Sequence, residues 1–256
     1  MSTIADLKAF LDEKYDKYNH PDFIGSDPVQ IPHSFSDPYD IEISAFLSAT
    51  IAWGQRSTII KNSQRLITLM DHAPYDFVTN CNTSELKRFE YFVHRTFNGV
   101  DCVFFIKSLK NIYKNHGGLG SLFQQEYLYK QNIKATLEGV RNVFFEIDHP
   151  ERTNKHFSDV SRGASAKRLN MFLRWLVRND NRGVDFGLWQ KIPASALYLP
   201  LDLHTGNVAR KLGLLNRKQN DWLAVEEVTN NLRKFDPIDP VKYDFALFGL
   251  GIFEKF

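Results

Sequence analysis

Two residues in the second half of the chain, Lys167 and Asp202, could supply a nucleophilic amine and a carboxylate to one reaction. Lys167 lies near the start of SAKRLNMFLRWLVR, residues 165–178, whose apolar residues recur with helical spacing. A lysine attacks carbon only as a neutral amine. The positive potential at a helix start and the neighbouring cation Arg168 both favour that neutral form. Taken alone, a surface lysine that contacts a phosphate is the simpler interpretation.

Asp202 lies in the second segment, LPLDLHTGNVARKLGL at residues 199–214. The sequence predicts a helix from about Leu203 to Leu212, ended by Gly213 in a left-handed conformation. Asp202 then occupies the N-cap, where one carboxylate oxygen accepts hydrogen bonds from backbone N–H groups. Capping alone explains such an aspartate, although its second oxygen stays available for chemistry.

The overall charge of +2, from 32 basic and 30 acidic residues, does not by itself indicate a nucleic-acid partner. The distribution is more informative, since residues 155–182 hold seven Lys or Arg against two Asp. Residues 207–218 hold four Lys or Arg and no acid. A locally basic surface fits a phosphate backbone, while solvated helix faces are an alternative explanation of the same pattern.

Helical periodicity dominates the chain and predicts a mostly α fold, with a loop over residues 21–38 and a turn over residues 117–120. Helices are predicted over residues 3–18, 40–53, 56–71, 84–96, 100–114, 131–147, 165–178 and about 203–212. No convincing alternating strand, repeat or low-complexity segment is present in the sequence. The charged turn from Asp236 to Asp244 is expected to position an apolar C-terminal helix against the core.

The helix over residues 165–178 is predicted to have two distinct faces. Its buried stripe is formed by Leu169, Phe172, Leu173 and Leu176. Its other face is a basic edge formed by Lys167, Met171, Arg174 and Arg178. Lys167 therefore begins the basic edge of a well-anchored helix.

Several classes of protein are not indicated. The sequence has no apolar run of about 18 residues and no secretory signal, which predicts a cytoplasmic protein without a membrane partner. Cys81 and Cys102 are not spaced like metal ligands and are expected to be reduced thiols. No H-x-x-x-H pair, G-x-S-x-G motif or P-loop is present. We therefore expect no metal and no cofactor.

The order of these segments resembles the helix-hairpin-helix DNA glycosylases, which include endonuclease III and the 8-oxoguanine glycosylases. The shared features are a hairpin turn at residues 161–164, a helix-borne lysine, and a leucine- and proline-rich approach to an aspartate that opens a helix. The 35-residue step from Lys167 to Asp202 is most similar to the archaeal 8-oxoguanine glycosylases. Upstream, AFLSATIAWGQRSTIIKNSQRL resembles the helix, turn and helix that line the base pocket in this class.

Over its full length the chain also resembles a bacterial family that shares the SAKRLNMFLRWLVR, LPLDLHTGNVARKLGL and DPVKYDFALFGLGI blocks. It departs from the glycosylase pattern at the hairpin, where SRGASA replaces a leucine-proline-glycine-valine-glycine motif. No cysteine cluster follows the aspartate, so the iron–sulfur cluster of endonuclease III is not implied.

The resemblance implies a bilobal helical fold of the helix-hairpin-helix glycosylase type, with a cleft between the lobes. It implies one domain over residues 1–256, with lobes near 40–150 and 151–256 plus the N-terminal helix. The implied activity is base excision with associated AP (abasic-site) lyase chemistry, on an oxidised purine such as 8-oxoguanine. Lys167 is then the nucleophile and Asp202 its carboxylate partner.

The expected partner is damaged double-stranded DNA, bound by a monomer in the cytoplasm at the nucleoid. The residues expected to contact DNA or the flipped base are Trp53, Gln55, Arg56, Arg162, Gly163, Arg168, Arg174, His204 and Arg210. A core tryptophan, a capping glutamine and a solvent-exposed histidine are equally simple interpretations of Trp53, Gln55 and His204. The altered hairpin leaves open a non-catalytic protein of the same fold that binds DNA or recognises damage. A helical scaffold with no nucleic-acid partner is a third hypothesis.

Overall fold

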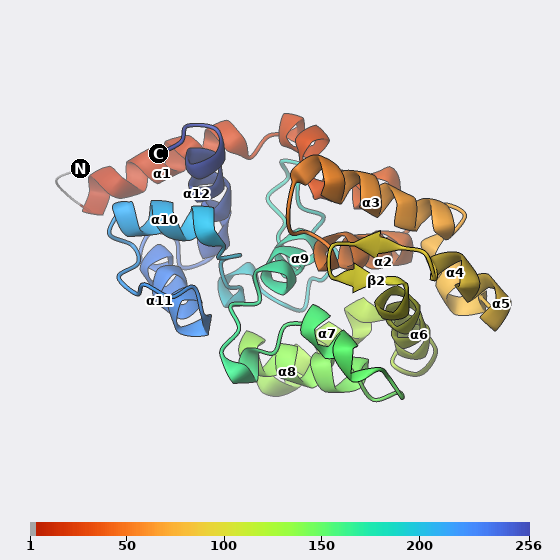
Figure 1. The fold of residues 1–256 in the computed structure, drawn as a ribbon. Coiled ribbons are helices and arrows are strands. Elements are labelled where there is room, and N and C mark those ends of the chain that lie inside the picture. The colour runs from red at the N-terminus through yellow and green to blue at the C-terminus, as the bar shows by residue number, and fades with distance from the viewer. Residues whose placement is uncertain (1–3) are drawn as a thin grey trace. The chain divides into compact units, whose positions relative to one another are not determined.

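The computed structural model describes residues 4–256 and shows a mostly helical chain, as predicted. The chain divides into two compact units (Figure 1). Unit 1 contains the residues up to Gly25 together with Val160–Phe256, and unit 2 contains Ser26–Asp159. Within residues 4–256, no helix is both long enough and apolar enough to cross a membrane.

Unit 1 brings the two ends of the described chain together. Its helices are α1 (Ile4–Tyr18), α9 (Lys167–Val177), α10 (Leu203–Lys211), α11 (Trp222–Arg233) and α12 (Tyr243–Ile252). Its short 3-10 helices are η6 (Val160–Arg162), η7 (Ala194–Ala196) and η8 (Pro240–Lys242), and η1 (Pro21–Ser26) ends at the first residue of unit 2. In Figure 1, α1 and α10 both lie beside α12, which is apolar along most of its length.

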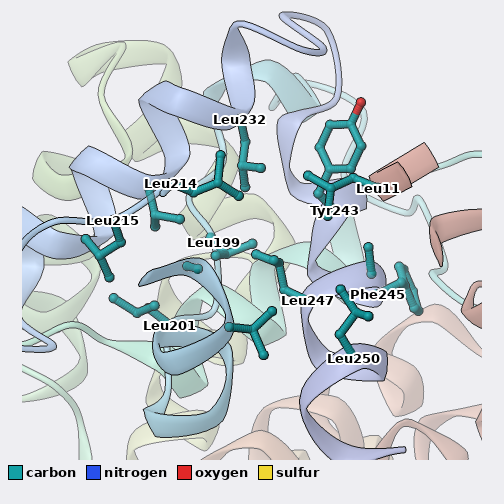
Figure 2. Packing of buried hydrophobic residues seen from close by; sticks show 14 of the residues in the cluster. Leu11, Leu199, Leu201, Leu214, Leu215, Leu232, Tyr243, Phe245, Leu247 and Leu250 are labelled. Carbon is teal, nitrogen blue, oxygen red and sulfur yellow. The ribbon is translucent and has the colours of Figure 1, made fainter. Parts of the chain in front are cut away.

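The core of unit 1 explains how α10 is held. Leu199 and Leu201 are fully buried in the same hydrophobic cluster as Phe245 and Leu247 of α12 (Figure 2). Leu11 of α1 joins this cluster from the other end of the chain. Burying side chains of this size contributes roughly 1.5–3 kcal/mol each, so the approach to α10 is anchored by its apolar residues.

Unit 2 is built around α2 (Pro38–Thr50), which is buried from Ile41 to Thr50. Its other helices are α3 (Arg56–Leu69), α4 (Pro74–Asn80), α5 (Thr83–Leu86), α6 (Gly99–Asn115), α7 (Leu119–Lys130) and α8 (Ile133–Phe144). Its 3-10 helices are η2 (Pro28–Gln30), η3 (Pro32–Ser34), η4 (Lys87–Phe89) and η5 (Glu151–His156), and its hairpin pairs β1 (Val93–His94) with β2 (Phe97–Asn98). Phe46 of α2 packs against Phe105 and Phe144, so aromatic rings fill much of this core.

The predicted helix over residues 84–96 is wrong beyond its first turn. A capping box at Asn82 starts α5, but the chain then passes through η4 into the hairpin. Arg95 has a φ of 54°, a left-handed conformation that turns the hairpin and that a helix excludes. The sequence interpretation also missed α4, α7 and α11, and it gave residues 21–38 as a loop where three short 3-10 helices occur. Cys81 and Cys102 are buried free thiols, as predicted.

The basic edge predicted for α9 is also wrong at its C-terminal end, because Arg178 is 1% exposed. Its guanidinium donates to Asp239 Oδ2 at 2.8 Å and to Asp185 Oδ2 at 3.0 Å. Asp180 Oδ2 lies 2.8 Å from Nη2, and the Tyr15 hydroxyl accepts from the same nitrogen. Burial opposes the charge of Arg178, but the three carboxylates outweigh it and raise the pKa of this residue.

Arg178→Met is therefore expected to destabilise unit 1 by roughly 3–5 kcal/mol, because the three carboxylates would lose the buried cation that they share. The free energy of unfolding in urea measures this loss. Arg182→Met is the matched control, since the Arg182 pair with Asp16 lies at the surface and contributes about 0–1 kcal/mol. Equal unfolding midpoints for Arg178→Met and the unmodified chain would show that the buried network carries no net stability.

Candidate functional site

Lys167 is the first residue of α9 and follows a tight turn. Gly163 has a φ of 84° and Ala166 a φ of 49°, so two left-handed residues reverse the chain before the helix. Asn170, fully buried in α9, holds the turn in place: its backbone N–H donates to the Ala166 carbonyl at 2.9 Å, and its side-chain amide donates to the Ser165 carbonyl at 3.2 Å. The position of Lys167 is thus fixed by its own helix and by the turn.

The same turn is tied to the start of α11. Ala164 forms an isolated β-bridge with Asp221, and the Trp222 N–H donates to the Gly163 carbonyl at 2.9 Å. Trp222 is 1% exposed, which makes it a firm anchor. The hairpin turn expected at residues 161–164 is therefore a braced turn, held by backbone contacts with the start of α11.

Asp202 is the N-cap of α10, which confirms the prediction from sequence. Its Oδ1 accepts a hydrogen bond from the Thr205 N–H at 2.9 Å. Leu199 and Leu201 are buried on either side of Pro200, so the backbone leading to Asp202 has little freedom. Capping uses Oδ1 and leaves Oδ2 to face other groups.

A polar bridge fixes the Asp202 backbone as well. The Asn220 side-chain amide donates to the Asp202 carbonyl at 3.1 Å, and the Arg210 guanidinium donates to Asn220 Oδ1 at 2.6 Å and to the Lys218 carbonyl at 2.9 Å. Gly206 makes room for this bridge, because a Cβ there would lie 2.9 Å from Asn220 Oδ1. Both bonds come from Nη2 of Arg210, and Nε donates to the Arg217 carbonyl at 2.8 Å, so most of this guanidinium serves the bridge and its contact with DNA stays a prediction.

The structure brings Lys167 and Asp202 together. Lys167 Nζ lies 3.8 Å from Asp202 Oδ2, a distance within the range of an ion pair but longer than a hydrogen bond. The two side chains are 26% and 27% exposed, so solvent reaches both. This confirms the predicted proximity of the pair. An amine and a carboxylate at this spacing are close enough to act on one carbon atom.

Arg174 does not lie on an exposed basic edge, which corrects its assignment as a DNA contact. It is 3% exposed, its Nε donates to Asp185 Oδ1 at 3.3 Å, and its Nη1 donates to Asp244 Oδ2. A buried guanidinium held by two carboxylates cannot reach a phosphate. On this face of α9, Arg174 therefore forms part of the buried interior of unit 1.

Four other predicted residues of unit 1 differ in exposure. Arg162 and His204 are exposed, and Gly163 has open space around the position of a Cβ. Arg168 is partly buried, and burial lowers its pKa to about 10. Arg162, His204 and Gly163 therefore remain candidate contacts for a ligand, as solvent-accessible groups.

The remaining predicted residues belong to unit 2. Trp53 is partly buried, with its ring 4.9 Å from that of His94 in an edge-on contact. Gln55 is the N-cap of α3 but makes no side-chain capping bond, so capping does not explain the choice of glutamine. Arg56 is partly buried at the first position of α3.

Sequence reasoning missed two residues that shape the site, Asn170 and Asn220, and it missed the buried contact of Asp244 with Arg174. One sequence signal could have indicated Asn170: it is a polar residue that directly follows Leu169, a member of the apolar stripe of this helix. Asn220 and Asp244 act through contacts with residues far away in the sequence, which periodicity does not reveal.

The comparisons with known proteins identify a family. A family model described as "Protein of unknown function (DUF2400)" matches residues 27–253. The chain belongs to the DUF2400 family. Lys167, Asp202 and Asp244 all lie inside the DUF2400 match. No curated protein and no solved structure is similar enough to count as a match. Across residues 4–256, no group of three or more His, Cys, Asp or Glu is arranged to hold a metal ion.

Proposed function

We propose that this protein is a DNA base-excision glycosylase with associated AP-lyase activity. In this proposal the chain has a bilobal helix-hairpin-helix fold and binds damaged double-stranded DNA as a monomer in the cytoplasm. The substrate is an oxidised purine such as 8-oxoguanine. The substrate preference rests on the 35-residue step from Lys167 to Asp202, which is similar to that of the archaeal 8-oxoguanine glycosylases.

The observation that carries the proposal is the 3.8 Å separation of Lys167 Nζ from Asp202 Oδ2, with both side chains partly exposed. A lysine used only for phosphate contact needs no carboxylate at this distance, and an N-cap aspartate needs no amine. The braced turn before α9 and the Asn220 bridge to Asp202 restrict both groups. Such restriction favours the orientation that a reaction requires.

The proposed chemistry uses each group in turn. A flipped nucleotide places C1′ of its sugar beside the pair. Positive charge develops on the sugar as the bond to the base breaks, and the Asp202 carboxylate stabilises it. The neutral Lys167 amine bonds to C1′ while the base leaves with the electron pair of the broken bond and takes up a proton. Ring opening then gives a Schiff base, and β-elimination cuts the strand on the 3′ side.

Borohydride trapping tests this proposal. The purified protein is incubated with duplex oligonucleotides that carry an abasic site, 8-oxoguanine or another damaged base, and the Schiff base is reduced. We expect a covalent protein–DNA adduct and a nicked strand with the abasic duplex, and base release with at least one damaged base. Binding is expected to weaken as the salt concentration rises.

The remaining outcomes of this assay separate the other hypotheses. Salt-dependent binding without an adduct or base release on any lesion would overturn the enzymatic proposal in favour of a non-catalytic DNA-binding protein. Failure to bind duplex DNA even at low salt would overturn both and leave a helical scaffold with another partner.

A further inference from the structure

One carboxylate near the Lys167–Asp202 pair has no part in the chemistry described above. Asp244, in the first turn of α12, is 4% exposed. Its Oδ2 accepts a hydrogen bond from Arg174 Nη1, whereas its Oδ1 is buried and no group among residues 4–256 donates a hydrogen bond to it. A buried acceptor without a donor is unfavourable, which points to a role other than packing.

Asp244 interacts electrostatically with both members of the pair. The charged groups that act on its carboxylate are Arg174 and Lys167 from α9 and Asp202 at the start of α10. The α1 helix also packs on α12, but its Asp12 faces Tyr243 and Lys242 instead. Burial raises the pKa of Asp244 to about 6, although Arg174 and Lys167 act in the opposite direction.

We infer that Asp244 is a positioning residue, whose carboxylate, held by Arg174, sets the charge of the Lys167 amine and the Asp202 carboxylate. This inference rests on the proposed function and deepens it. Asp185 holds the Nε side of Arg174, so the guanidinium stays in place whichever charge Asp244 carries. The unpaired Oδ1 provides the place where a proton binds without breaking the bond to Arg174.

The charge of Asp244 has opposite effects on the two proposed steps. A negative Asp244 adds to the field of Asp202 and stabilises the cationic sugar, which favours base release. The same negative charge favours the protonated form of Lys167, which slows its attack at a preformed abasic site. A merely structural role for Asp244 would slow both steps together when the residue is replaced.

Lysine titration by NMR tests the inference without DNA. Lysine amines of the full chain are reductively methylated with ¹³C-formaldehyde, and the Lys167 signal is assigned from its absence in Lys167→Arg. We expect the titration midpoint of this signal to fall by about one pH unit in Asp244→Asn, the effect of removing one charge several ångströms away. Asparagine keeps the volume of Asp244 and an acceptor for Arg174.

Asp185→Asn is the matched control, because it alters the same guanidinium on its Nε side. We expect it to lower the unfolding midpoint and to leave the Lys167 signal unchanged. An unchanged Lys167 midpoint in folded Asp244→Asn would overturn the inference. If Asp244→Asn does not fold, the titration of the Lys167 signal in the chain without substitutions decides. A second inflection of this signal near pH 6, caused by the titration of Asp244, supports the inference, and its absence overturns the inference.

Reactions with DNA provide the second arm. In Asp244→Asn we expect about tenfold slower base release. We also expect the rate of borohydride trapping at a preformed abasic site to keep its pH dependence, with the acid limb of the pH–rate profile shifted to lower pH by about one unit. Slowing of both reactions at every pH would overturn the inference. Because the NMR arm needs no DNA, absence of all DNA chemistry would defeat the proposed function alone and leave the electrostatic coupling measurable.

Discussion

Lys167→Gln is expected to abolish the borohydride adduct, with a loss of at least about a thousandfold in trapping rate. Glutamine has no amine that can form a Schiff base, although it is similar to lysine in its ability to lie along a helix surface. Because Lys167 is only partly buried and its ion pair with Asp202 spans 3.8 Å, the fold and the binding of duplex DNA should be retained. Trapping yield and a gel-shift titration of the same samples measure the two properties.

The matched control for this variant is Lys218→Gln, an exposed lysine in the same unit. It removes one positive charge without touching the pair, and its trapping rate should stay within about twofold of the unmodified chain. Equal loss of adduct in both variants would mean that charge, and not a nucleophile at residue 167, determines trapping.

Asp202→Asn is expected to slow base release by about 10²–10³-fold, since the charge that stabilises the developing cation is lost. Asparagine is as good an N-cap as aspartate, so the bond from the Thr205 N–H and the start of α10 should persist. Trapping at a preformed abasic site should suffer less, because no base then has to leave. Single-turnover base release with a damaged duplex, compared with trapping at an abasic site, measures this difference.

Asp37→Asn tests the alternative that Asp202 is only a cap. Asp37 caps α2 by accepting from the Tyr39 and Asp40 N–H groups. The same substitution there changes a cap without changing the proposed site, so base release should be unaffected. Base release by Asp202→Asn at the rate of the unmodified chain would assign Asp202 to capping alone.

The sequence predicts best where local signals agree. The apolar stripe of α9 and the aspartate, helix and glycine order of α10 each lie within one segment, and both helices occur where they were expected. The proximity of Lys167 to Asp202 is not a local property. It was inferred from the resemblance of these segments to the helix-hairpin-helix glycosylases, and the structure contains it.

The errors have a shared physical cause in long-range contacts. Arg174 and Arg178 look like surface cations in a helical pattern, but carboxylates from the 180–185 loop and from residues 239 and 244 bury them. The segment after α5 was predicted to continue as a helix, yet Arg95 in a left-handed conformation turns it into a hairpin. No pattern within either segment reports these partners.

The central claim is that Lys167 is the amine that bonds to the sugar beside Asp202. Peptide mapping of the reduced protein–DNA adduct tests it most directly: the adduct is digested with protease and nuclease, and the modified residue is located by tandem mass spectrometry. We expect the mass of the reduced sugar fragment on Lys167. The same mass on another lysine or on an N-terminal amine would contradict the claim.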